Sequence, residues 1–255
     1  MKKIMFVALC LAFSYSLSAQ DKEDINTKDK IFYGKPTKQD RIAVDVFTDM
    51  WMMNSEAADS IDAKQINLGV SWHYKYEILF GKSNFSFAAG LGFSLHNLHS
   101  DAIPINYTID SLTGNKVYGG STVFTKIPLK STDGSQDISY VKNKFTAIYV
   151  DIPFEFRYRL RNNAFKFYLG GKLGLMLGSY NTYNGDNYNE DSPTPKMRVR
   201  EYAIPNVNNV RYGLTVRTGW KWIQVYGYYS LSHLFKKDKG PEMYPISVGL
   251  TISPY

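Results

Sequence analysis

The chain has 255 residues, is 44% hydrophobic and 15% aromatic, and carries a formal net charge of +7 at pH 7. This composition excludes an intrinsically disordered chain, which would lack the aromatic residues, and a disulfide scaffold, which would need more than one cysteine. A helical membrane protein is excluded as well, because no apolar run of about 18 residues follows the first twenty positions. The length suits one large or two small domains with a sizeable core.

The first residues predict export. Lys2 and Lys3 precede a short apolar stretch at residues 4–13, and a small residue follows at a suitable cleavage position. We expect a secretory signal peptide at residues 1–19, because the apolar stretch is too short for a transmembrane helix. Cys10 lies within this segment, so the mature protein is expected to contain no thiol or disulfide.

The charge of the exported protein favours lipid over nucleic acid as a partner. Removal of Lys2 and Lys3 lowers the net charge from +7 to +5. Export makes nucleic acid a poor candidate partner, and anionic lipid headgroups are the more natural one. The charged residues 20–39 show no periodicity, and we expect them to form a periplasmic N-terminal lead-in.

From Arg41 onward, apolar and polar residues alternate, and helical spacing is absent. Leu68, Val70 and Trp72, for example, share one face of a strand, whereas His73 lies on the other. A tilted strand needs about 9–11 residues to cross a bilayer, and each predicted strand is long enough. The predicted strands are residues 40–50, 66–80, 84–97, 144–160, 164–179, 209–218, 221–234 and 243–253.

Three connections between these strands are expected to be two-residue turns. They are Gly81-Lys82, Asn162-Asn163 and Gly219-Trp220, and glycine and asparagine are the residues that tight hairpin turns favour. Each turn fixes a register in which apolar residues face apolar residues. The expected pairs are Ile78 with Phe85, Leu160 with Phe165, Arg159 with Lys166, and Val216 with Ile223.

The other four connections are long and polar. Short turns at one end and long loops at the other, with an even number of strands, are typical of outer-membrane barrels. We therefore predict an all-β fold, an eight-stranded antiparallel up-and-down transmembrane β-barrel at residues 40–255 with long external loops. Both termini would then lie in the periplasm. The long connections are residues 51–65, 98–143, 180–208 and 235–242.

A soluble secreted β-sandwich or lipocalin-like barrel is the alternative, because its strands alternate in the same way with the apolar face inside. The size of the side chains distinguishes the two folds. Phe85, Phe87 and Leu91 lie on the apolar face of their strand, whereas Ala88 and Gly90 lie on the opposite face. An eight-stranded lumen is only just wide enough for side chains to fill, so small residues inside and large residues outside favour the membrane barrel.

One strand resembles a known family. The segment Tyr149-Val150-Asp151-Ile152-Pro153-Phe154-Glu155-Phe156-Arg157-Tyr158 resembles the Ile-Pro strand of the PorT-like outer-membrane β-barrel family of Bacteroidetes. The glycine-rich strand at residues 167–172 and the closing strand at 245–252 are similar to that family as well. The resemblance covers residues 40–255 and implies an outer-membrane barrel. One branch of the family is linked to type IX secretion, which makes envelope or secretion-system proteins candidate partners.

The polar faces of the strands carry charged residues that a barrel would enclose. Unpaired charges in a narrow lumen are costly, so we expect cross-strand salt bridges, with water in the gaps. A cation-lined anion pore is the alternative, which the bulk of the side chains in an eight-stranded barrel disfavours. The predicted lumen ionic network consists of Arg41, Asp45, Asp49, Lys75, Glu77, Asp151, Glu155, Arg157, Arg159, Lys166, Lys172, Arg211 and Arg217.

The histidines and serines indicate no metal, cofactor or catalytic site. His73, His96, His99 and His233 fall on different segments, and the spacing of His96 and His99 matches no metal-binding motif. Ser94 and His96 share the inward face and could supply a nucleophile and a base, but no third group or oxyanion element accompanies them. We therefore expect no enzymatic activity.

Specific function is expected in the loops. Residues 105–110 and 116–118 flank a turn signal at 111–115 and predict a hairpin, and the tyrosine-rich loop 180–208 lacks the spacing of a calcium site. We predict a monomeric barrel with a structural or interaction role, which displays extracellular loops and assists an envelope or secretion assembly. A small pore or transport protein is the second candidate, and a lipid-modifying outer-membrane enzyme is the third.

Overall fold

The computed structural model describes residues 40–80, 83–110, 116–130, 137–160, 165–187 and 196–253. The expected signal peptide at 1–19, the lead-in at 20–39 and the Asn162-Asn163 turn lie outside the described residues.

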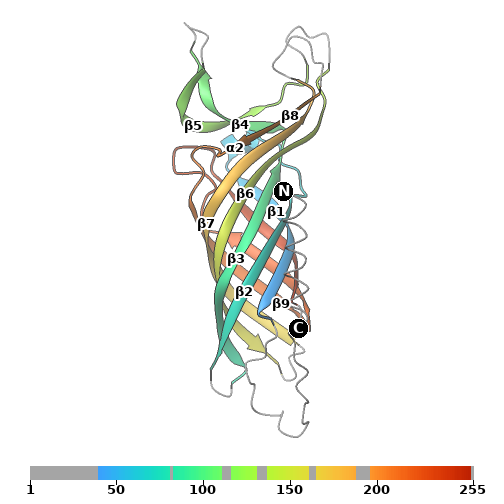
Figure 1. Ribbon diagram of the computed structural model, residues 1–255, viewed down its shortest axis with the longest axis vertical. Coiled ribbons are helices and arrows are strands. Elements are labelled where there is room, and N and C mark those ends of the chain that lie inside the picture. Colours follow the sequence, from blue (N-terminus) through green and yellow to red (C-terminus); the bar gives the residue numbers. More distant parts are fainter. Residues whose placement is uncertain are drawn as a thin grey trace, which may run out of the picture. The chain divides into compact units, whose positions relative to one another are not determined.

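Eight antiparallel strands close into a barrel (Figure 1). Each strand pairs with the next barrel strand in the sequence, and the last pairs with the first, which is the predicted up-and-down arrangement. The alternation of residues has the same physical origin in every strand, because successive side chains point to opposite faces. The strands are β1 (Ile42–Met53), β2 (Leu68–Leu79), β3 (Phe85–His99), β6 (Tyr140–Arg159), β7 (Phe165–Gly185), β9 (Val210–Trp220), β10 (Ile223–Ser230) and β11 (Met243–Ile252).

The outward face of the barrel is apolar, and the inward face is polar and charged. Trp72, Phe93 and Phe156 are among many large apolar side chains that remain exposed on the outside, whereas Asp45 and Lys75 are buried within. A soluble protein does not leave such a continuous apolar surface exposed to water, so this surface faces lipid. We call it the apolar belt, and its members include Val46, Val70, Trp72, Tyr74, Ile78, Phe85, Leu91, Phe93, Ile152, Phe154, Phe156, Phe167, Leu169, Leu173, Leu175, Tyr212, Leu214, Val216, Val225, Val248 and Leu250.

Four further elements lie beyond one end of the barrel (Figure 1). They are the helix α2 (Ser55–Ser60), the two-stranded hairpin of β4 (Ala102–Ile109) and β5 (Lys116–Lys126), and β8 (Met197–Tyr202). Asn54 caps α2 by accepting a 2.9 Å hydrogen bond from the Ala57 amide. β8 pairs with the outer part of β7, residues 180–185, and has no other neighbour in the sheet.

No helix in the described part of the chain is both long enough and apolar enough to cross a membrane.

One of the three predicted hairpin registers is confirmed. Arg159 lies opposite Lys166, and the Leu160 amide donates a 3.0 Å hydrogen bond to the Phe165 carbonyl.

The other two registers are wrong by an even number of residues. Ile78 lies opposite Phe87 rather than Phe85, and the predicted turn residues Gly81 and Lys82 lie outside the described residues. Val216 lies opposite Gly227 rather than Ile223, because the turn is formed by residues 221–222. A shift by an even number leaves every side chain on its predicted face, so the alternation could not expose these errors.

The strand ends and external elements also differ from the prediction. β6 begins at Tyr140 rather than 144, β7 continues to Gly185 rather than 179, and β10 ends at Ser230 rather than 234. The predicted hairpin is present but longer, since β4 and β5 span residues 102–109 and 116–126. β8 and α2 were not predicted, because each has only six residues and β8 is exposed along nearly its whole length.

Candidate functional site

Charged side chains from many strands meet inside the barrel. At the end near the short turns, Asp40 accepts hydrogen bonds from Lys166 at 2.9 Å and from the Tyr168 hydroxyl at 2.8 Å. Arg159 lies 3.4 Å from Asp40 and forms a 2.6 Å ion pair with Glu77. Two carboxylates and two cations are therefore joined in one cluster that β2, β6 and β7 build with Asp40, which lies two residues before β1.

Glu155 on β6 is the centre of the next cluster. Its Oε1 lies 2.7 Å from Nζ of Lys75, and its Oε2 lies 3.0 Å from Nη2 of Arg157. Arg217 on β9 also contacts Oε1. Three cations thus contact one carboxylate, and Glu155 has more contacts with Lys and Arg side chains than any other described carboxylate of the lumen.

Asp45 on β1 accepts bonds from three directions. Nη2 of Arg217 lies 2.9 Å from Oδ2, and the hydroxyls of Ser71 and Thr251 each donate a 2.6 Å hydrogen bond. Arg217 therefore connects Asp45 to Glu155, and the two clusters form one network.

A second arginine holds Asp151 on β6. Nη2 of Arg211 lies 2.8 and 2.9 Å from the two carboxylate oxygens of Asp151, and it also donates to Ser94. Lys172 lies 3.6 Å from the same carboxylate. His73 links the two halves of the network, because its nitrogens lie 3.4 Å from Asp45 and 3.5 Å from Asp151.

Aromatic rings fill the lumen toward the end of the barrel that carries the long loops. The Arg211 guanidinium lies 4.1 Å from the centre of the Tyr149 ring, and Nζ of Lys172 lies 4.3 Å from that of Tyr228. Cations over ring faces are stabilised electrostatically, especially where water is excluded. Phe47, which is fully buried, packs against Tyr226 with a centroid distance of 5.7 Å.

Several of these bonds cross the bore instead of joining neighbouring strands. Asp45 is on β1 and Arg217 on β9, and β10 and β11 separate these strands in the sheet. Ser94 is on β3 and Arg211 on β9, with β6 and β7 between them. Because an eight-stranded lumen is only about as wide as its side chains, such bonds close it.

Twelve of the thirteen predicted lumen residues are buried, with exposed fractions of 8% or less. Arg41 is the exception, because it is half-buried and its guanidinium lies 5.9 Å from the ring of the outward-facing Tyr76. The prediction missed Asp40, which precedes β1 with φ at 63° and so falls outside the alternation. With Asp40 included, six buried carboxylates face seven buried Lys and Arg side chains among the described residues.

The histidines and serines do not assemble into a recognised catalytic or metal site. Nδ1 of His96 lies 2.9 Å from Asp49, and its buried Nε2 has no hydrogen-bond partner in the structure. Ser94 accepts a bond from Arg211 instead of donating one to His96. Within the described part of the chain, no three His, Cys, Asp or Glu side chains are grouped to hold a metal ion.

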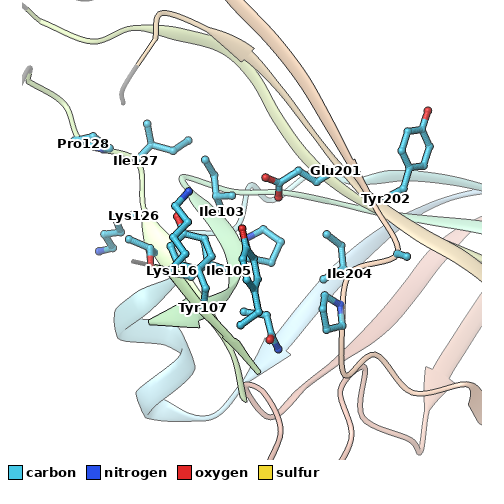
Figure 2. A pocket seen from close by; sticks show the side chains of 16 residues that line it. Ile103, Ile105, Tyr107, Lys116, Lys126, Ile127, Pro128, Glu201, Tyr202 and Ile204 are labelled. Atoms are coloured by element: carbon cyan, nitrogen blue, oxygen red, sulfur yellow. The ribbon is translucent and has the colours of Figure 1, made fainter. Parts of the chain in front are cut away.

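The elements beyond the barrel form a groove, shown in Figure 2. Ile103, Ile105, Tyr107 and Lys116 of the β4–β5 hairpin line one side, and the segment that ends β8 lines the other. The cavity has a volume of about 470 Å³. We call it the external groove, and its lining includes Ile103, Ile105, Tyr107, Lys116, Tyr118, Ile127, Glu201, Tyr202, Ile204 and Pro205.

Hydrogen bonds fix the two sides of the external groove to each other. The Thr122 hydroxyl donates to the Pro205 carbonyl at 2.9 Å, and the Asn206 amide donates to the Gly120 carbonyl at 2.8 Å. Tyr118 is highly exposed, and Nζ of Lys116 lies 4.4 Å from the centre of the Tyr107 ring. Aromatic, aliphatic and charged groups therefore line one surface.

Comparison with known proteins supplies the family. A family model described as "Outer membrane protein beta-barrel domain" matches residues 39–236, which include seven of the eight barrel strands in full. No curated protein and no solved structure matches the chain. The fold, the apolar belt and this match agree, and the chain belongs to the outer membrane protein beta-barrel domain family, as a protein of the outer membrane.

Proposed function

We propose that this protein is a closed, monomeric anchor in the outer membrane that presents the external groove to a protein of the cell envelope. The observation that carries the proposal is the set of ion pairs across the bore, above all those that Arg217 makes to Asp45 and Glu155. A barrel filled in this way offers no path for solutes, so its specific activity belongs to the elements outside the barrel.

The proposal includes an orientation. In bacterial barrels the short turns lie in the periplasm and the long loops lie outside the cell. The short connections between β2 and β3 and between β9 and β10 would then be periplasmic, as would both termini, and the external groove would face the surroundings. The PorT-like resemblance of β6 supports a partner from an envelope or secretion assembly.

A transport role and a lipid-modifying role have less support. Passage of a solute would require the bonds across the bore to break together, and each leaves a buried charge unpaired when it breaks. Nucleophilic catalysis would require a hydroxyl bonded to His96, and the Nε2 atom of His96 has no such partner.

Photo-crosslinking in intact cells tests the interaction role. A benzophenone amino acid is placed at Tyr118, which is 73% exposed in the external groove, and in a control at Tyr212, which is 49% exposed on the apolar belt. We expect one discrete protein adduct from position 118, identified by mass spectrometry as the same envelope protein in repeated experiments, and none from position 212. The proposal is contradicted by the same adduct from both positions, or by none from position 118.

A further inference from the structure

The outer ends of β3, β6, β7 and β8 carry a pattern that the filled lumen and the external groove do not explain. On the face of these strands that carries the apolar belt, the residues opposite each other form successive rows, in which Thr146 and Thr182 are buried. The first row is apolar and consists of Leu95, Ile148 and Gly178. It marks the upper limit of the apolar belt on this side of the barrel.

The second row places two tyrosines immediately beyond the belt. Thr146 on β6 lies opposite Tyr180 on β7, and Tyr180 lies opposite Tyr202 on β8. The two tyrosine rings are 6.0 Å apart. Tyrosines at this height are typical of the membrane interface, because the ring is apolar and the hydroxyl is polar.

The third and fourth rows are cationic. Lys144 lies opposite His99 on β3 and Thr182 on β7, and Thr182 lies opposite Arg200 on β8. One pleat further out, Lys142, Asn184 and Arg198 repeat the arrangement. We call Lys142, Lys144, Arg198 and Arg200 the basic rows.

The basic rows have no anionic partner among the described residues. None of the four forms an ion pair, whereas the cations of the lumen are paired. Burial and the positive charges of Lys144, Lys142 and Lys64 lower the pKa of His99 to about 4. Like charges are thus gathered here without a compensating carboxylate among the residues that the structure describes, which favours binding of an external anion.

Arg200 is held in place for such a contact. Its guanidinium carbon lies 4.9 Å from the centre of the Tyr180 ring, and its Nε donates a 3.3 Å hydrogen bond to the Thr182 hydroxyl. Its Nη1 also donates a 3.5 Å hydrogen bond to the Tyr202 hydroxyl. Nη2 and the second hydrogen of Nη1 can meet a phosphate in the forked geometry that arginine provides.

The height of the basic rows matches the headgroup layer. Lys144 is four residues beyond Ile148, which is about 13 Å along a strand and about 10 Å along the membrane normal at the usual tilt. The polar layer on each side of the hydrocarbon is about 5–8 Å thick, and long basic side chains reach several ångströms back toward it. The cations of the third row therefore reach the depth of lipid phosphates.

We propose that the basic rows bind the phosphate groups of a phosphorylated lipid in the outer leaflet of the outer membrane, with its acyl chains along Leu95 and Ile148. The inference rests on the orientation in the proposed function, in which this end of the barrel faces outward. It is independent of whether the external groove binds a protein.

Native mass spectrometry of the purified full-length protein in detergent, with bisphosphorylated lipid A as the probe, tests the site. The row variant is Lys142→Gln/Lys144→Gln/Arg200→Gln, and the matched control is Lys236→Gln/Lys237→Gln/Lys239→Gln, which removes three exposed cations from the β10–β11 connection. Each basic residue near an anionic lipid surface raises the affinity about fivefold, so we expect the row variant, which lacks three of them, to bind on the order of 100-fold more weakly than the wild type. The control should bind within about twofold of the wild type.

Two further measurements distinguish a lipid site from a site for free phosphate. Monophosphorylated lipid A should bind the wild type more weakly than the bisphosphorylated form, and millimolar inorganic phosphate should not displace either, because the acyl chains add affinity that free phosphate lacks. Displacement by inorganic phosphate would show a site for free phosphate and overturn the lipid assignment, as would equal binding by the row variant and the wild type. If the row variant does not fold, as judged by its heat-dependent gel mobility, Lys142→Gln alone and the salt dependence of wild-type binding replace it. The proposal is overturned if Lys142→Gln binds lipid A as tightly as the wild type and wild-type binding does not change with the salt concentration.

The experiment uses detergent, so it does not depend on orientation in the cell. Loss of the Tyr118 adduct with intact lipid binding would contradict the proposed function alone, and the reverse result would contradict the lipid site alone.

Discussion

Glu155 contacts more Lys and Arg side chains than any other carboxylate of the described lumen. Its two oxygens contact Lys75, Arg157 and Arg217, and all four side chains are buried. Removal of one member of a buried ion pair is strongly destabilising, because it leaves the partner charge buried and uncompensated.

We therefore expect Glu155→Gln to lower the free energy of unfolding by about 3–5 kcal/mol. Urea unfolding in lipid vesicles, followed by tryptophan fluorescence, measures the change. Glu242→Gln is the matched control, because Glu242 is exposed outside the barrel, and it should change stability by no more than about 0.5 kcal/mol. Equal stability of the two variants would contradict the role of Glu155.

His99 lies at the outer end of β3, beyond the apolar belt. Burial and then the charges of Lys144, Lys142 and Lys64 lower its pKa from the ordinary 6.5 to about 4. The unfolded chain therefore binds a proton between pH 6.5 and 4 that the folded protein does not, so this residue makes folding stability fall as the pH falls through that window.

Titration of the His99 ring followed by NMR in detergent should give a midpoint near pH 4. The double variant Lys142→Gln/Lys144→Gln should raise the midpoint part of the way toward 6.5, because burial, the largest cause, remains. A midpoint near 6.5 in the wild type would contradict the crowding of positive charge at this position.

The sequence could predict which residues are charged and inward but not their individual partners. The alternation of inward and outward residues assigned thirteen residues to the lumen, and twelve of them are buried there. The prediction was wrong for Arg41, because this residue precedes the first residue of β1. Pairs such as Asp45 with Arg217 are 172 positions apart in sequence and meet only through the curvature of the closed barrel. Alternation within one strand contains no information on that distance.

At the scale of the strands, glycine allows close approach inside the barrel. Gly90 on β3 lies opposite Lys75, and a Cβ at this position would lie 1.9 Å from the Tyr74 carbonyl oxygen. No real Cβ lies that close to a backbone oxygen, so an added methyl group would push β2 and β3 apart. Gly178 on β7, in contrast, has no atom within 4 Å of the equivalent position.

Gly90→Ala should therefore destabilise the barrel by about 1–3 kcal/mol, as overpacking does elsewhere. Gly178→Ala is the matched control and should leave stability within about 0.5 kcal/mol of the wild type. Urea midpoints of both variants in vesicles measure the difference. A Gly90→Ala protein as stable as the control would show that the strands approach less closely than the structure indicates.

The hairpins show what strand patterns can and cannot predict. The faces of β2, β3, β9 and β10 follow from alternation, but their registers do not, because shifts of two or four residues preserve each face. Glycine preference pointed to residues 219–220 as the turn, yet Lys221 occupies the left-handed region, with φ at 53°. The two exposed residues 221–222 form the turn so that Trp220 and Ile223 can pair on the apolar belt.

The membrane-crossing part was predictable, whereas of the external part only the hairpin of β4 and β5 was. Eight apolar faces and short turns suffice to predict the barrel, since lipid on one side and a narrow lumen on the other restrict each position. The loop end obeys no such restriction. β8 lies against the outer part of β7 with polar residues on both faces, and the external groove is closed by contacts such as Thr122 with Pro205.

In the proposed function, the charged side chains of the lumen close the barrel. The most direct test is the current through single molecules of the full-length protein in a planar bilayer, with a known porin as the positive control. Ion pairs across the bore predict no steady conductance steps above the bare bilayer at any salt concentration at which the barrel remains folded. Reproducible steps of uniform size would contradict the account, because they would require an open path past Arg211, Arg217 and Glu155.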